Sequence, residues 1–229
     1  MQPTTAMARR ATETRPRLSR EHVARAALGL LDEHGLDALS MRRLADHLGV
    51  GTMTLYGYFR SKDELLDAVV DAAVADREPV RLEGTWQERL RRLMQSTRRG
   101  LGRHPGLVKV RADRPVLRPE ALRFAEAGLG ILREAGFDRS DAARGFRLLF
   151  TYVFGYVSFS PVQTEADARR RARAATAALP ADEYPAVHDS ADELAEAMAG
   201  EETFDFGLDR IIDGLEARLR ETGTATRRG

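Results

Sequence analysis

Cysteine is absent from all 229 positions of the sequence. Its absence excludes a disulfide framework, a zinc–thiolate site and a cysteine nucleophile. Long apolar runs are also missing: the longest mainly apolar stretch, Leu148 to Phe159, has 12 residues, whereas a membrane-spanning helix needs about 20. The N-terminus is polar and arginine-bearing, unlike a secretory signal. We therefore expect a soluble, cytoplasmic protein with no membrane partner.

An excess of charge of one sign is missing too, since 36 basic and 35 acidic residues leave a net charge of +1. The distribution of these charges is uneven. The stretch from Asp182 to Glu216 contains twelve acidic residues and one basic residue, Arg210. Residues 1–20 contain five arginines and a single acidic residue, Glu13. Those arginines are Arg9, Arg10, Arg15, Arg17 and Arg20. This polarity is typical of a protein with one end facing phosphate groups.

Caps and apolar spacing predict several short helices in the first third of the chain. Residues 1–18 lack apolar periodicity and are interpreted as a flexible arginine-rich arm, either a disordered start or an arm that tracks the DNA backbone or minor groove. Ser19 and Ser40 are N-caps of two helices that end at Gly35 and Gly49. A third helix is predicted from about Thr52 to Phe59, and Ser61–Glu64 has the pattern of a capping box that opens a fourth.

Helical periodicity returns after Pro79 and Gly84. The predicted helices cover about 85–100, 120–135, 140–160 and 202–221, and the polar stretch between the last two is interpreted without a helix. The fold class is therefore all-α. The predicted organisation is an arm (1–18), a three-helix helix-turn-helix domain (19–66), a larger helical effector-binding and dimerisation domain (67–221) and a disordered tail (222–229).

Two short helices joined by a tight glycine-containing turn, with a third packed across them, have the geometry of a helix-turn-helix. If Leu55 and Phe59 are buried, the opposite side of the reading helix presents hydroxyls to phosphates and methyl groups to thymine. An ordinary three-helix corner with aromatic packing is the alternative. The side chains expected at DNA include Thr52, Met53, Thr54, Tyr56 and Tyr58.

The run from Leu39 to Leu66, LSMRRLADHLGVGTMTLYGYFRSKDELL, resembles the helix-turn-helix signature of the TetR family. The resemblance implies that Arg42 reaches a base, that Thr52 and Met53 read bases, and that Thr54, Tyr56 and Lys62 hold phosphates. Tyr58 is a further phosphate or base candidate. Gly57 departs from the tetracycline repressor itself, which has a bulky aromatic residue there, so the operator should differ.

In the body, the helix predicted over 140–160 is apolar on two sides and must be buried on both. Together with the last helix it could form a self-complementary four-helix interface between two subunits. The alternative is that both helices fill the core of a single subunit. The residues predicted for dimerisation are Leu149, Tyr152, Tyr156, Leu208, Ile211, Ile212 and Leu215.

The segment from Lys109 to Pro115 and the helices that follow it resemble the effector domain of the tetracycline-repressor subgroup. By this resemblance the histidine that chelates the metal falls at Val110, and the acidic residue that supports the metal site falls near Phe159. Both are missing here, so a magnesium–tetracycline complex is not expected as the effector. No other metal and no cofactor is expected either. A cavity for an apolar or aromatic molecule is predicted instead, with plain core packing as the alternative. Its predicted lining is Met94, His104, Val110, Arg114, Phe124, Phe150 and Phe154.

Signs of catalysis are few. The five histidines are scattered without metal-ligand spacing, and the Gly128–Gly130 pair lies inside a predicted helix, so it does not form a dinucleotide fingerprint. The sequence therefore predicts a repressor, not an enzyme: a homodimer that binds a palindromic double-stranded DNA operator and is released by a small effector. An effector-independent DNA-binding or architectural protein, or an activator, is the alternative.

Overall fold

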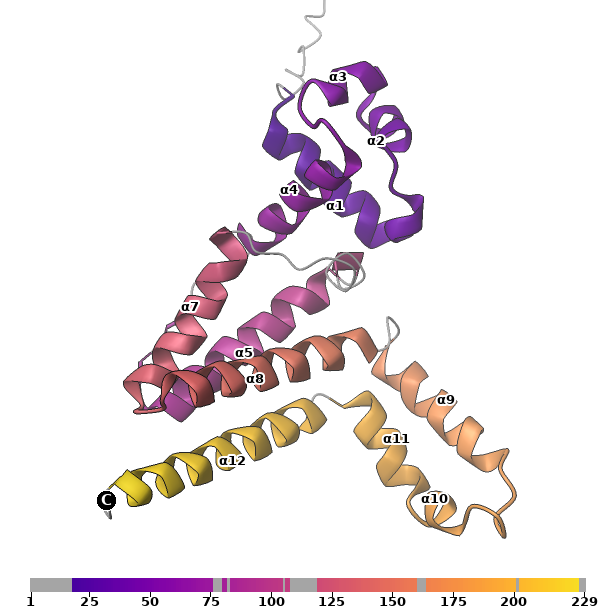
Figure 1. Cartoon of the computed structure of the whole chain (residues 1–229). Coiled ribbons are helices and arrows are strands. Elements are labelled where there is room, and N and C mark those ends of the chain that lie inside the picture. Colours follow the sequence, from indigo (N-terminus) through magenta and orange to yellow (C-terminus); the bar gives the residue numbers. More distant parts are fainter. Residues whose placement is uncertain are drawn as a thin grey trace, which may run out of the picture.

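The computed structural model describes residues 18–75, 80–81, 83–104, 106–107, 119–159, 164–200 and 202–226. Regular structure in these ranges is helical throughout, with no strand, which confirms the all-α prediction. The helices form a small N-terminal head, a body below it and a lateral projection (Figure 1). Within the same ranges, no helix is both long and apolar enough to cross a membrane.

The head contains α1 (Arg20–His34), a 3-10 turn (Leu36–Ala38), α2 (Met41–Leu48), α3 (Thr52–Tyr56) and α4 (Lys62–Ala75). The predicted caps are present: the Ser19 and Ser40 hydroxyls each accept a backbone N–H at 3.1 Å, and Gly49 ends α2 in the left-handed conformation. α3 is shorter than predicted: after Tyr56 the backbone tightens into i→i−3 hydrogen bonds, from the N–H of Gly57 to the carbonyl of Thr54 and from that of Tyr58 to Leu55.

The core of the head is formed by apolar side chains from all four helices, with Leu55 and Phe59 fully buried. It extends along α4 to Ala73 and also includes Leu107, which follows the first helix of the body. The packed head therefore continues past residue 66, where the sequence placed its limit. Helix α4 belongs to the head and also contacts helix α7 (Pro119–Glu134) of the body.

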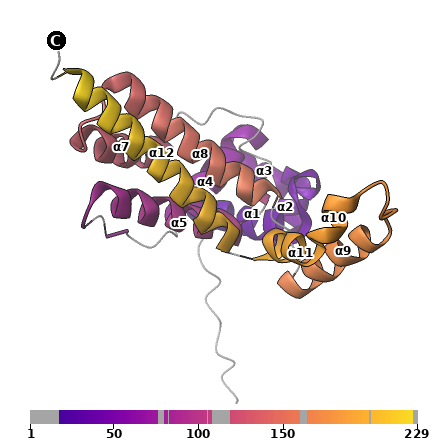
Figure 2. The same cartoon turned by 90° about the horizontal axis from the view of Figure 1, so that it is seen from below.

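The body packs α5 (Trp86–Arg103), α7 (Pro119–Glu134), α8 (Arg139–Phe159) and α12 (Glu202–Thr226) around a second core. Seen from below, α12 runs alongside α8 (Figure 2). Gly145 permits this approach, because a Cβ there would lie 2.9 Å from Leu215. The prediction of a disordered tail is wrong for residues 222–226, since α12 continues to Thr226; residues 227–229 lie outside the described residues.

The projection consists of α9 (Glu165–Ala177), α10 (Pro185–Asp189) and α11 (Ala191–Ala199), in a region where no helix was predicted. Thr164 caps α9, and ion pairs join α9 to α11, including Arg169 to Glu196 at 2.6 Å and Arg173 to Asp192 at 2.9 Å. Alanine favours helix without burial. Few large apolar side chains mark these helices, so the apolar periodicity that reveals a helix is missing.

Candidate functional site

The predicted DNA-contacting side chains come from α2, α3 and the start of α4, at the end of the head far from the body (Figure 1). Buried Leu44 and Leu55 hold α2 and α3 together, which leaves the outer side of α3 open. Met53 is 80% exposed. Of the other candidates, Thr52 is half-buried, and those exposed to solvent are Arg42, Thr54, Tyr56 and Lys62.

Tyr58 is not part of this exposed set. Its hydroxyl donates to the carbonyl of Leu18 at 2.9 Å and the residue is half-buried. A phenol has one proton to donate, and here that proton is used inside the head. The prediction of Tyr58 as a phosphate or base contact is therefore corrected: it anchors the start of the described chain.

A charged network beside Tyr58 connects α1 to the α3–α4 junction. Arg20 donates to the carbonyl of Tyr58 and pairs with Glu64 at 2.9 Å. The pKa of Glu64 lies below its ordinary value, first because the backbone N–H of Arg60 donates to its carboxylate and then because Arg20 does. Ser61 caps α4, because its hydroxyl accepts from the N–H of Glu64. The Glu64 carboxylate, however, accepts from the N–H of Arg60 and not from that of Ser61. The predicted capping box is thus only half formed.

In the body, four phenylalanines form a continuous aromatic row. Phe146, Phe150 and Phe154 follow one another at four-residue intervals on α8, with ring centroids 6.4 and 5.8 Å apart. Phe124 of α7 packs on the first of them at 5.4 Å. All four rings are half-buried. Gly128 permits the α7–α8 approach, because a Cβ there would lie 2.5 Å from the Phe146 ring.

The other residues predicted for the effector cavity do not join this row. Met94 is fully buried in the body core, so it has no surface for a ligand, and its prediction is corrected to core packing. His104 contacts the head. Val110 and Arg114 lie outside the described residues, as does the arm at 1–17. Phe124, Phe150 and Phe154 are therefore the predicted lining residues that the structure brings together.

The end of α5 and the turn after it connect the body to the head. The Nδ1 of His104 lies 2.7 Å from Oδ2 of Asp32 on α1; it donates, because an ionised carboxylate only accepts. A Cβ on Gly106 would lie 2.7 Å from the carbonyl oxygen of Leu31, so glycine permits the close contact. Leu107 then enters the head core. Sequence reasoning missed this junction, since no local pattern pairs residues 72 positions apart.

Most residues predicted for dimerisation are used within the subunit. Tyr152 donates to the carbonyls of Thr203 and Phe204 and so holds α8 to α12. Tyr156 donates to the carbonyl of Gly200 at the end of α11, and its ring packs on Phe204 of α12. Ile211 is half-buried beside them. The remaining four side chains have too little exposed surface to meet a second copy, which corrects their assignment to core packing: Leu149, Leu208, Ile212 and Leu215.

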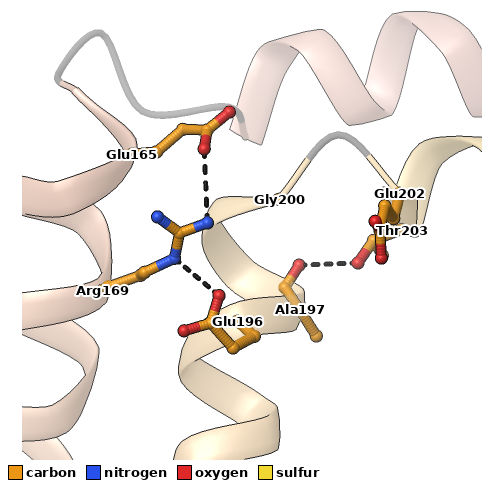
Figure 3. A pocket seen from close by; sticks show the side chains of 7 residues that line it. All are labelled: Glu165, Arg169, Glu196, Ala197, Gly200, Glu202 and Thr203. Carbon is orange, nitrogen blue, oxygen red and sulfur yellow. Dashed lines mark hydrogen bonds and ion pairs between the residues drawn. The ribbon is translucent and has the colours of Figure 1, made fainter.

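A hollow of about 500 Å³ lies between α9, α11 and the start of α12. Figure 3 shows Arg169 in it, paired with Glu165 and Glu196. Its lining is mostly polar and it is separate from the aromatic row. Among the described residues, no group of three acidic or histidine side chains could hold a metal ion.

Comparisons with known proteins match both parts of the chain. The model described as bacterial regulatory proteins, tetR family, covers residues 24–69, and the tetracyclin repressor-like C-terminal domain covers residues 78–219. The transcriptional repressor DrrR1 of Streptomyces coeruleorubidus is 34% identical over 221 residues, which are 90% of this chain and 80% of DrrR1. The class D tetracycline repressor of Escherichia coli is 32% identical, over 89% of this chain and 91% of its own.

Solved structures share the same architecture. ActR of Streptomyces coelicolor, in complex with (S)-DNPA, superposes with a TM-score of 0.73 at 33% identity, covering 87% of this chain and 98% of its own. In complex with actinorhodin, ActR gives a TM-score of 0.69 at 31% identity, over 89% of this chain and 99% of its own.

Proposed function

The chain belongs to the TetR family of bacterial transcriptional regulators, and from this premise we propose that it is an effector-released repressor. In this proposal a homodimer binds a palindromic operator and leaves it when a small apolar or aromatic molecule binds the body. The observation that carries the proposal is the open outer side of α3, where Met53 is 80% exposed above a fully buried Leu55. An exposed methionine of this kind is unfavourable in water and favourable against a thymine methyl in the major groove.

DNA contact divides into two chemical roles. Arg42, at the start of α2, is proposed to donate to a guanine edge, and Thr52 and Met53 to contact bases at the start of α3. Tyr56 and Lys62 are proposed to donate to phosphates, which fixes the register of the head without reading sequence. All of these side chains except half-buried Thr52 are exposed.

The proposed dimer interface is the outer side of α8 and α12, since the inner sides are used within the subunit. Large apolar side chains remain exposed there: Phe159 is 91% and Phe206 65% exposed. Gly155 on α8 and Gly214 on α12 have no atom within 4 Å of a Cβ position. Helices without side chains at these points can be approached closely by helices of a second copy, in a four-helix interface.

The proposed effector site is the aromatic row of Phe124, Phe146, Phe150 and Phe154. Half-buried rings stacked along one helix offer an apolar, flat surface, and aromatic ligands stack on such rings at similar spacing. The complexes of ActR with (S)-DNPA and actinorhodin support a small-molecule site in a body of this architecture. Because α5 packs beside α7 and α8 and His104 follows directly after it, movement around the row would be passed to α1 through the His104–Asp32 contact.

Selection of bound sequences from a random DNA pool tests the DNA part of the proposal. The expected result is two inverted half-sites whose centres lie about one helical turn, or a multiple of it, apart; a non-palindromic site would contradict the dimer.

Gly214→Glu should shift the protein to monomer in sedimentation, because a charge would then face the interface. Gly102→Glu, on a solvent-exposed helical glycine with equally open surroundings, is the matched control.

A thermal-shift screen of hydrophobic antibiotics and metabolites tests the effector part. A compound that binds the row should raise the Tm and lower operator affinity, and Phe150→Ala should weaken both effects. A complete absence of compounds that do so would favour the effector-independent alternative.

A further inference from the structure

Methionine supplies all the sulfur in this chain, since the sequence has six methionines and no cysteine. Of the methionines that the structure describes, two are shielded by the protein: Met41 is 7% exposed and Met94 is fully buried. The other two are open to solvent, Met198 on α11 at 61% and Met53 on α3 at 80%. Among these four, an oxidant in solution therefore reaches Met53 and Met198 first, because their thioethers are the ones that meet solvent.

The surroundings of Met53 leave its side chain uncovered. Met53 is the second residue of α3, on the side opposite the fully buried Leu55. The turn that leads into α3 has open space around it: a Cβ on Gly49 would have no atom within 4 Å, and a Cβ on Gly51 would meet the Thr54 hydroxyl at 3.8 Å. The Met53 side chain is thus accessible in the free head, and it lies on the surface proposed to contact the operator.

Oxidation would change the chemistry of this contact and leave the backbone intact. The thioether sulfur gives an electron pair to one oxygen atom of the oxidant and becomes a sulfoxide. The oxidant is reduced, a hypohalous acid to a halide ion and a proton, or hydrogen peroxide to water. The sulfoxide is polar, whereas the proposed partner of Met53 is a thymine methyl. Covering the sulfoxide oxygen with that methyl leaves an acceptor without a donor, which should lower the affinity of a half-site by about tenfold or more.

We infer that Met53 is a reversible oxidation site that controls operator binding, with the sulfoxide as the form that does not bind. The inference rests on the proposed operator binding. Bound DNA covers the Met53 side chain, so the free repressor is the form that is oxidised, and the modification then keeps it from returning to the operator. Reversal requires a thiol-dependent sulfoxide reductase, which removes the oxygen as water while two thiols become a disulfide. Met198 has similar exposure but lies on the projection, away from α3 (Figure 1), so it is an internal control.

The test treats the full chain with a limiting amount of hypochlorous acid, so that each exposed methionine is converted only in part. The mixture is incubated with a limiting amount of a selected operator, bound and free protein are separated, and the sulfoxide at each methionine is measured by mass spectrometry. We expect the Met53 sulfoxide to be depleted about tenfold or more in the bound protein, and the Met198 sulfoxide to be equal in both fractions. When the operator is added before the oxidant, it should protect Met53 and leave the oxidation of Met198 unchanged.

Two variants assign the effect to one sulfur atom. Met53→Leu keeps an apolar side chain without sulfur, and its affinity after treatment is compared only with that of its own untreated form, from which it should not differ. Met198→Leu should lose affinity on treatment as the wild type does, and a sulfoxide reductase should restore the oxidised wild type.

Equal Met53 sulfoxide in bound and free protein would overturn the inference while leaving the repressor intact. So would an equal loss of affinity on treatment in Met53→Leu and the wild type. If untreated Met53→Leu does not bind, the distribution of the sulfoxide between bound and free wild type still decides. Failure of the untreated wild type to bind any selected operator would instead refute the proposed function, and the inference with it.

Discussion

The contact between His104 and Asp32 provides a quantitative test of how the body is joined to the head. The Asp32 carboxylate is 23% exposed, and one of its oxygens accepts from His104 at 2.7 Å. The other oxygen is buried and has no hydrogen-bond partner among the described residues. His104→Ala would thus leave a largely buried carboxylate unsatisfied at both oxygens, a loss of about 1–3 kcal/mol in the free energy of unfolding. For a chain of this length that lowers the Tm by about 2 to 12 °C.

A double-mutant cycle isolates the pair from general damage. His104→Ala and Asp32→Ala together should destabilise less than the sum of the two single changes, by about 0.5–3 kcal/mol. Chemical denaturation at one fixed protein concentration provides the measurement, since a dimer's stability depends on concentration. The matched control is the exposed pair His34 and Glu33 on the same helix, 3.7 Å apart, whose coupling should stay below about 0.5 kcal/mol. Additive losses for His104 and Asp32, within about 0.5 kcal/mol, would refute the reasoning.

Three further outcomes are expected. Arg42→Ala should cost about 1–3 kcal/mol at one base pair of the operator, whereas Lys62→Ala should weaken binding to all sequences and lower the salt slope; equal losses of every operator variant for Arg42→Ala would contradict base reading. Gly128→Val should displace the aromatic row and weaken effector binding at least tenfold in calorimetry, and Gly130→Val, where nothing lies within 4 Å of a Cβ, should not. Burial raises the pKa of Tyr152 from about 10 to about 12, so folding favours the neutral phenol. The stability that this pKa shift contributes should be complete below about pH 10 and lost as the pH rises to about 12. Over that pH range the urea midpoint of the Tyr152→Phe variant should fall less steeply with pH than that of the wild type. Equal slopes of midpoint against pH in the two proteins would exclude this linkage.

The head was largely predictable because its signals are local. Ser19, Ser40 and Gly49 act on backbone groups within four residues of themselves, and the apolar spacing around Leu55 depends on one helix alone. The exposed reading surface follows directly, since the side of α3 opposite a buried leucine must face solvent. The end of α3 was less predictable, because the backbone tightens into i→i−3 hydrogen bonds after Tyr56, a change that the apolar pattern does not report.

The helices of the body could be predicted from the sequence, but which helix face packs against which could not. The periodicity of α8 and α12 shows that both are buried on more than one side, yet it does not say whether the covering surface comes from the same chain. The structure assigns Leu149 and Leu208 to the subunit core and leaves Phe159 and Phe206 outside. The helices α9 and α11 were missed for the opposite reason: ion pairs and alanine stabilise them without an apolar stripe.

By itself, then, the amino-acid sequence determined the helical class, the caps and spacing of the helix-turn-helix, and the chemistry that the outer side of α3 presents. Only the tertiary structure decided which apolar faces meet, that Tyr58 anchors Leu18 instead of reaching outward, and that His104 meets Asp32. The physical reason is range: caps and periodicity act between residues about four positions apart, whereas burial and pairing join segments as much as 118 positions apart, as in the pair of Arg91 and Asp209.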